Sequence, residues 1–175
     1  MPTRTVGFDK FQRKLKKMSK AVDDLDDKTV MKVAGEVRNR IIKRTLRGRD
    51  VDMKSFKAYS KLTNEYRSEK GRKTGRPNLA FSFRMLGNMS VKKYRKGAMI
   101  HFTSTAQNDK AVWHNEGVSP HKIVAKNKKV LSNGIRFFGK EVTVSLPKRE
   151  FFGLSKHNHK YVLSELRQPV VKAMR

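Results

Sequence analysis

The sequence predicts an α+β domain with helices at its N-terminal end, an antiparallel β-sheet of about four to six strands, a short inserted helix, and a C-terminal helix packed on the sheet. Apolar residues recur at spacings of three and four before residue 48 and after residue 155, which is the period of an amphipathic helix. Short apolar runs between turn residues fill the region between, as in strands. The 175 residues suit one domain, 1–175.

Two helices are expected at the start of the chain. The first covers residues 8–22 and carries basic residues on its polar face, among them Lys14 and Lys17, so that residues 1–27 form a basic N-terminal helical extension. Four aspartates in residues 23–27 are well placed to cap a second helix over 28–47; a cation site is the alternative, but an EF-hand's spacing is missing. Gly48 is expected to end this helix.

The next segment, residues 48–78, is polar and rich in turn residues. We expect one short helix after Ser60 and then an exposed basic loop over 71–77. The loop lacks the Gly-Lys-Ser/Thr ending of a Walker motif. Arg72, Lys73 and Arg76 are candidates for DNA or phosphate contact, and a solvated mobile loop is an equal alternative.

The central strands are expected in hairpins. After a short helical stretch that ends near Gly87, strands are predicted at 89–94 and 98–103, and a helix at 107–116 carries Trp113 and His114. Further extended pieces are predicted at 123–125, 129–131, 135–138 and 142–146, with a hairpin turn at Asn133-Gly134.

A junction over residues 146–155 joins the last strand to the last helix. Pro147 cannot donate to a sheet ladder and should end the strand, and Ser155 is a good N-cap. Phe151 and Phe152 need a packing partner, either within the chain or on a neighbouring subunit. Pro169 should kink or shorten the last helix.

Charge is the strongest signal in the composition. Lys and Arg number 42 against 15 acids, a formal net charge of +27, which favours a polyanionic partner, most commonly nucleic acid, over a membrane. Absence of cysteine excludes disulfides and thiol chemistry, and we expect no membrane-spanning helix and a cytoplasmic site of synthesis. No arrangement of residues suggests catalysis, a cofactor or a metal, and the triplet His157-Asn158-His159 resembles a nuclease motif only in its letters.

The junction carries a family resemblance. Residues 147–155 followed by a terminal helix resemble the C-terminal signature of the phage virion morphogenesis (tail-completion) proteins of tailed bacteriophages. Three upstream segments are similar to family motifs in the same order: residues 48–52 with Phe56 and Tyr59-Ser60, Pro77-Asn78-Leu79 with Met85-Leu86, and residues 111–117. The family often has glycine where Met53 stands, and a small residue and glycine near Phe83-Arg84, so these turns are expected to differ.

The resemblance implies a structural virion protein of the phage neck or tail end, not an enzyme, assembled in the cytoplasm of the host bacterium. Such proteins are expected to form a homo-oligomeric ring, six-fold favoured, around the DNA channel, next to neck, portal-side or tail-tube proteins. A basic ring would contact double-stranded DNA through phosphates, without sequence preference. Candidate subunit or assembly contacts are Arg149, Phe151, Phe152, Leu154 and Trp113, and candidate DNA contacts are Arg72, Lys73, Arg76, Lys14 and Lys17.

Two further readings stay open. Arg149 could pair with a carboxylate of a neighbour or be a solvated charge at a strand end. The alternative function is a free, sequence-nonspecific nucleic-acid-binding protein, although the chain has no helix-turn-helix, zinc or RNA-reading signature.

Overall fold

The computed structural model describes residues 13, 15–17, 20, 27–95, 97–124 and 141–174. In chain order, its elements are α2 (Asp27–Leu46), α3 (Lys61–Glu69), α4 (Arg84–Gly87), β1 (Met89–Tyr94), β2 (Gly97–Phe102), α5 (Thr105–Glu116), β3 (Val118–Val124), β4 (Glu141–Leu146) and α6 (Lys156–Met174). The α+β class is confirmed. Residues 13, 15–17 and 20 are helical, whereas Lys14 and the expected pieces 129–131 and 135–138, with their turn, lie outside the described residues.

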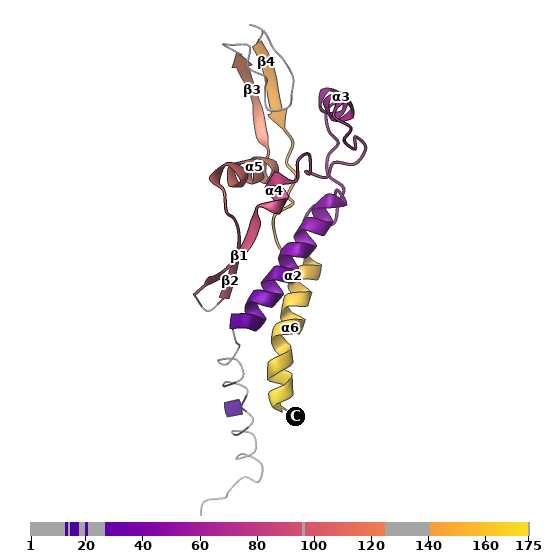
Figure 1. Cartoon of the computed structure of the whole chain (residues 1–175). Coiled ribbons are helices and arrows are strands. Elements are labelled where there is room, and N and C mark those ends of the chain that lie inside the picture. Colours follow the sequence, from indigo (N-terminus) through magenta and orange to yellow (C-terminus); the bar gives the residue numbers. More distant parts are fainter. Residues whose placement is uncertain are drawn as a thin grey trace, which may run out of the picture.

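The described strands form two separate two-stranded hairpins, so the expected single sheet of four to six strands is not confirmed. In the described part of the chain, β1 pairs with β2 and β3 pairs with β4, both antiparallel. Helix α5 and a left-handed turn at Gly117 (φ 81°) lie between the hairpins. Figure 1 shows the β3–β4 ribbon projecting at one end of the molecule and α6 reaching toward the other.

Helix α2 is the centre of the packing. It contacts both β1 and β2 on one side and α6 on another, so that α6 packs on α2 and not mainly on a sheet as expected. Its apolar residues Val33, Val37 and Ile41 are buried, as their spacing predicts. Gly48, with φ 68°, ends the helix, and its N–H donates to the carbonyl of Thr45.

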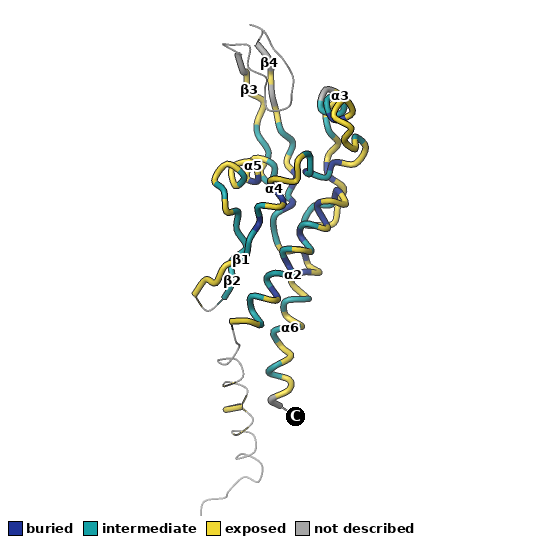
Figure 2. The backbone as a smooth tube through the Cα atoms, in the orientation of Figure 1, coloured by how far each residue is buried: buried dark blue, intermediate teal, exposed yellow. Residues whose placement is uncertain are grey.

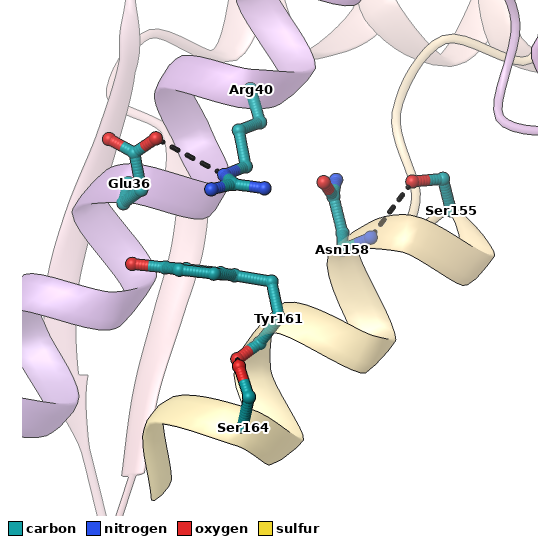
Figure 3. Close-up of polar contacts among 6 residues, drawn as sticks. All are labelled: Glu36, Arg40, Ser155, Asn158, Tyr161 and Ser164. Atoms are coloured by element: carbon teal, nitrogen blue, oxygen red, sulfur yellow. Dashed lines mark hydrogen bonds and ion pairs between the residues drawn. The ribbon is translucent and has the colours of Figure 1, made fainter.

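The contact between α2 and α6 combines apolar and charged groups. The guanidinium of Arg40 lies 3.8 Å from the ring centroid of Tyr161, and its Nε donates to the carboxylate of Glu36 at 3.1 Å (Figure 3). At the start of α6, Ser155 Oγ accepts a hydrogen bond from the N–H of Asn158, which confirms Ser155 as the N-cap. Helix α6 continues through Pro169 to Met174.

Burial is greatest where α2, α4, α5 and the segment before α6 meet (Figure 2). In the same view, the outer part of the β1–β2 hairpin is exposed, and α3 carries both exposed and intermediate residues. The core cluster consists of Val37, Ile41, Phe56, Leu79, Met85, Leu86, Met89, Ala111 and Phe151. The hairpins, α3 and the end of α6 therefore extend outward from one central core.

Candidate functional site

Residues 147–155 pass through the middle of the fold and are held there by a buried arginine of α2. Arg44 is only 6% exposed, and its Nη2 donates to the carbonyl oxygens of Phe151 at 2.6 Å and Gly153 at 3.1 Å. Burial lowers the pKa of Arg44, and the nearby Asp50 carboxylate partly opposes this shift. The strand-to-helix junction is thus tied to α2 by charge-assisted hydrogen bonds.

The two adjacent phenylalanines have different surroundings. Phe151 is 0% exposed and belongs to the core of this chain. Phe152 is half-buried; its ring lies 5.3 Å from that of Phe102, and its backbone N–H donates to Asn115 Oδ1 at 2.9 Å. Phe151 therefore has no surface to offer a neighbouring subunit in this conformation. Its packing partner is the core of its own chain.

Arg149 is also an interior residue. It is 3% exposed, and its Nε and Nη2 donate to the carbonyls of Lys57 and Ala58 at 3.0 and 3.1 Å. Its guanidinium lies 5.1 Å from the centroid of Tyr59. Burial lowers the pKa of Arg149, and the phenol of Tyr59 opposes that shift. The partners described for Arg149 are carbonyls and a ring of this chain, so Arg149 is not the solvated strand-end charge that was one of its two readings.

Leu154 and Trp113 are the exposed members of the predicted assembly set. Leu154 is 57% exposed and Trp113 is 53% exposed, and they lie in the segment before α6 and on α5. Large apolar side chains at such exposure are typical of contact surfaces when they gather in a patch. Of the five predicted assembly residues, these two are the most available to another protein.

The segments that carry the family resemblance meet at one place, which we call the motif junction: residues 48–56, 77–86, 111–117 and 147–155. Backbone hydrogen bonds connect them, because the N–H of Val51 donates to Glu150 O at 2.8 Å and that of Arg149 donates to His114 O at 2.7 Å. Phe151 shares the core with Leu79, Met85, Leu86 and Ala111. Segments up to about 100 residues apart in the sequence thus form one structural unit.

Met53 and Phe83, where the sequence departs from the family pattern, both have a backbone conformation that is unusual for residues other than glycine. Met53 has φ 68° and Phe83 has φ 59°, which is the left-handed region that glycine favours. Met53 lies in the loop closed by the Arg49–Ser55 bridge. The turns therefore have the conformation that glycine would adopt there, although the residues differ.

The predicted basic loop is tied to the rest of the fold. The side chain of Arg67, 3% exposed, donates to Lys73 O at 2.8 Å and to Asn78 Oδ1 at 3.2 Å. Arg72, Lys73 and Arg76 are exposed, as predicted, and Lys17 is exposed as well. Hydrogen bonds from the Arg67 side chain therefore fix the backbone of this loop at Lys73 and the side chain of Asn78 that follows it.

Arg44 and Arg67 were missed as organising residues. Basic residues are assigned to the surface by default, because burial of an unpaired charge is unfavourable. A signal did exist for Arg44: it follows Ile41 by three residues, on the apolar face that Val33 and Val37 begin.

Metal-ligating side chains do not gather in the part of the chain that the structure describes. No group of three or more His, Asp or Glu side chains among them could hold a metal ion. Burial and the charge of Arg149 lower the pKa of His114 to about 4, so that its ring is neutral at pH 7. None of the described helices is both long enough and apolar enough to cross a membrane.

Comparisons with known proteins leave the family open. The chain matches no family model, no curated protein and no solved structure.

Proposed function

We propose that this chain is a structural virion protein of the head–tail neck or tail end of a tailed bacteriophage. It forms a ring around the DNA channel, six-fold by preference, and joins or completes the tail during assembly in the host cytoplasm. Neighbouring neck, portal-side or tail-tube proteins are its partners, and it performs no catalysis.

The observation that carries the proposal is the motif junction. Four segments that resemble a tail-completion family in order and spacing also meet in space, around the buried Phe151 and the backbone hydrogen bonds of Arg149 and Glu150. Segments that matched by chance would have no reason to converge. The left-handed backbone at Met53 and Phe83 adds support, because glycine is common at or near these positions in the family.

The surface supports assembly in two ways. Leu154 and Trp113 expose apolar area suited to protein contacts, and the net charge of +27 suits a ring through which DNA passes. The free nucleic-acid-binding alternative explains the charge equally well but gives no role to the motif junction.

A complementation assay tests the proposal. A tailed phage with a nonsense codon in the gene for this chain is expected to accumulate DNA-filled heads and unfinished tails, and the purified chain should restore infectious particles in the extract. Normal particles from the nonsense mutant would contradict the proposal and favour the free nucleic-acid-binding protein.

A paired variant locates the assembly surface. The double variant Trp113→Ser, Leu154→Ser is expected to keep the wild-type melting temperature, because both side chains are mostly exposed, yet to lose complementation. Replacement of exposed polar residues of the same two regions, Asn108→Ser and Lys156→Ser, serves as the control and should retain it. Equal complementation by all variants would exclude Trp113 and Leu154 as assembly contacts.

A further inference from the structure

Helix α3 and the loop after it form a projection that we call the basic finger, residues 61–76. Figure 1 shows α3 set to one side of the molecule, away from both hairpins. Two exposed acids, Glu65 and Glu69, lie on the helix. Beyond them, residues 70–76 carry four exposed cations and no acid: Lys70, Arg72, Lys73 and Arg76.

The loop of the finger is held at both ends. Arg67 inside the finger binds the carbonyl of Lys73, and the N–H of Arg72 donates to Arg67 O at 2.7 Å. At the far end, the aliphatic part of Arg76 lies so close over Gly48 that a Cβ at this position would collide with it. Because the backbone is already ordered, placing four cations against a charged surface costs less conformational entropy than in a free loop.

The aromatic ring of Tyr66 in the finger and the neighbouring ring of Phe81 are both occupied. Tyr66 and Phe81 stack with centroids 5.4 Å apart, and the guanidinium groups of Arg67 and Arg72 lie 5.6 and 5.8 Å from the Phe81 centroid. The ammonium of Lys70 lies 5.8 Å from the Tyr66 centroid. Single-strand binding uses open aromatic faces on which bases stack. These rings stack on each other and on cations, which favours contact with duplex phosphates.

We infer that this chain binds the phosphate backbone of double-stranded DNA through the basic finger. The contacts are Lys70, Arg72, Lys73 and Arg76, and Arg67 is the residue that positions them. The inference rests on the proposed function in that DNA in the channel is the polyanion it meets. Recognition is independent of base sequence, because only phosphates are contacted.

The experiment compares two variants with equal charge. The finger variant carries Lys70→Gln, Arg72→Gln, Lys73→Gln and Arg76→Gln. The control carries Lys92→Gln, Lys110→Gln, Lys156→Gln and Lys160→Gln, which are exposed on β1, α5 and α6. Both remove four positive charges from a formal net charge of +27. Binding of a fluorescein-labelled DNA duplex of mixed sequence is followed by anisotropy from about 50 to 200 mM salt.

The finger variant is expected to bind the duplex at least about tenfold more weakly than the control at the low-salt end, with a salt slope reduced by up to about 0.9 per lost contact. Unlabelled oligo(dT) should displace the labelled duplex less well than unlabelled duplex does at equal phosphate concentration. Equal losses in the two variants, or stronger competition by oligo(dT), would overturn the inference.

A third readout separates this inference from the proposed function. If the wild-type chain restores infectivity but binds no duplex even at the lowest salt, the finger inference fails alone, and an acidic protein becomes its partner. If the chain binds duplex through the finger but does not restore infectivity, the neck assignment fails and the finger assignment stands. Arg67→Met leaves all four contact cations in place but should still weaken duplex binding. If those four cations acted without being positioned by Arg67, this variant would bind duplex as the wild type does.

Discussion

The Nη2 atom of Arg44 lies 2.6 Å from the carbonyl oxygen of Phe151, although 107 residues separate them in the sequence. This hydrogen bond joins the last turns of α2 to the strand-to-helix junction. It also places the most buried phenylalanine of the junction beside the helix that organises the fold.

Replacing Arg44 should loosen the motif junction. In Arg44→Met, the carbonyls of Phe151 and Gly153 lose a charged donor, and relief from burying the guanidinium offsets part of that loss. We expect the free energy of unfolding to fall by about 2 kcal/mol in urea denaturation. Arg47→Met, at an exposed position near the same helix end, is the control and should change it by less than about 0.5 kcal/mol. Equal stability of the two variants would show that the Arg44 contact contributes nothing.

Truncation within the junction should separate its core and surface residues. Phe151→Ala is expected to cost about 3–5 kcal/mol because its side chain is fully buried. For Phe152→Ala we expect about 2 kcal/mol, since Phe152 is only half-buried, and for Leu154→Ala under about 0.5 kcal/mol. A larger cost at Leu154 than at Phe151, measured by denaturant titration, would contradict the placement of this segment.

Met53 offers a substitution that should stabilise the protein. Its backbone has φ 68°, so Met53→Gly removes left-handed strain, and its 43% exposure limits the packing that is lost. After the entropy that glycine adds to the unfolded chain, a net gain of about 0.5–1 kcal/mol is expected. Met53→Ala keeps a Cβ and should give no gain. If thermal denaturation shows alanine stabilising as much as glycine, the turn does not have this conformation.

His114 should make stability depend on pH. Its pKa in the folded protein is lowered to about 4 from an ordinary value of 6.5, and Nδ1 is buried with no hydrogen-bond partner among the described residues. The unfolded chain therefore binds a proton between these values while the folded chain does not, so stability falls as pH drops from about 6.5 toward 4 and is constant for this group above 6.5.

The sign is tested by comparison with His114→Gln. Between pH 7 and pH 5, wild type is expected to lose about 2 kcal/mol more than the variant, as measured by urea unfolding at each pH. Parallel curves for the two proteins would mean that His114 titrates normally in the folded state.

Local features of the fold were predictable, because they depend on neighbours in the sequence. The period of Val33, Val37 and Ile41 predicted α2 to within a residue of its bounds, and Ser155 was identified as a cap from its place before a helical pattern. The β1–β2 hairpin was found from its turn at Gly97. Each of these signals lies within a few residues of the structure that it specifies.

Long-range features were not predictable in the same way. The division into two hairpins depends on how α5 and Gly117 turn the chain, and a strand pattern does not reveal its partner. Arg149 and Arg67 are buried because carbonyls far along the chain or around a loop accept their hydrogen bonds. Composition assigns such residues to the surface, because it does not show which carbonyls will lie near a guanidinium in the folded chain.

The neck assignment is tested most directly by cryo-electron microscopy of tailed phage particles that carry this chain with a small tag at its N-terminus. The account predicts a closed ring of tagged subunits, six by preference, around the DNA channel at the neck or tail end. Particles that are complete and infectious but hold no copy of the chain, or hold it without ring symmetry, would contradict the central claim.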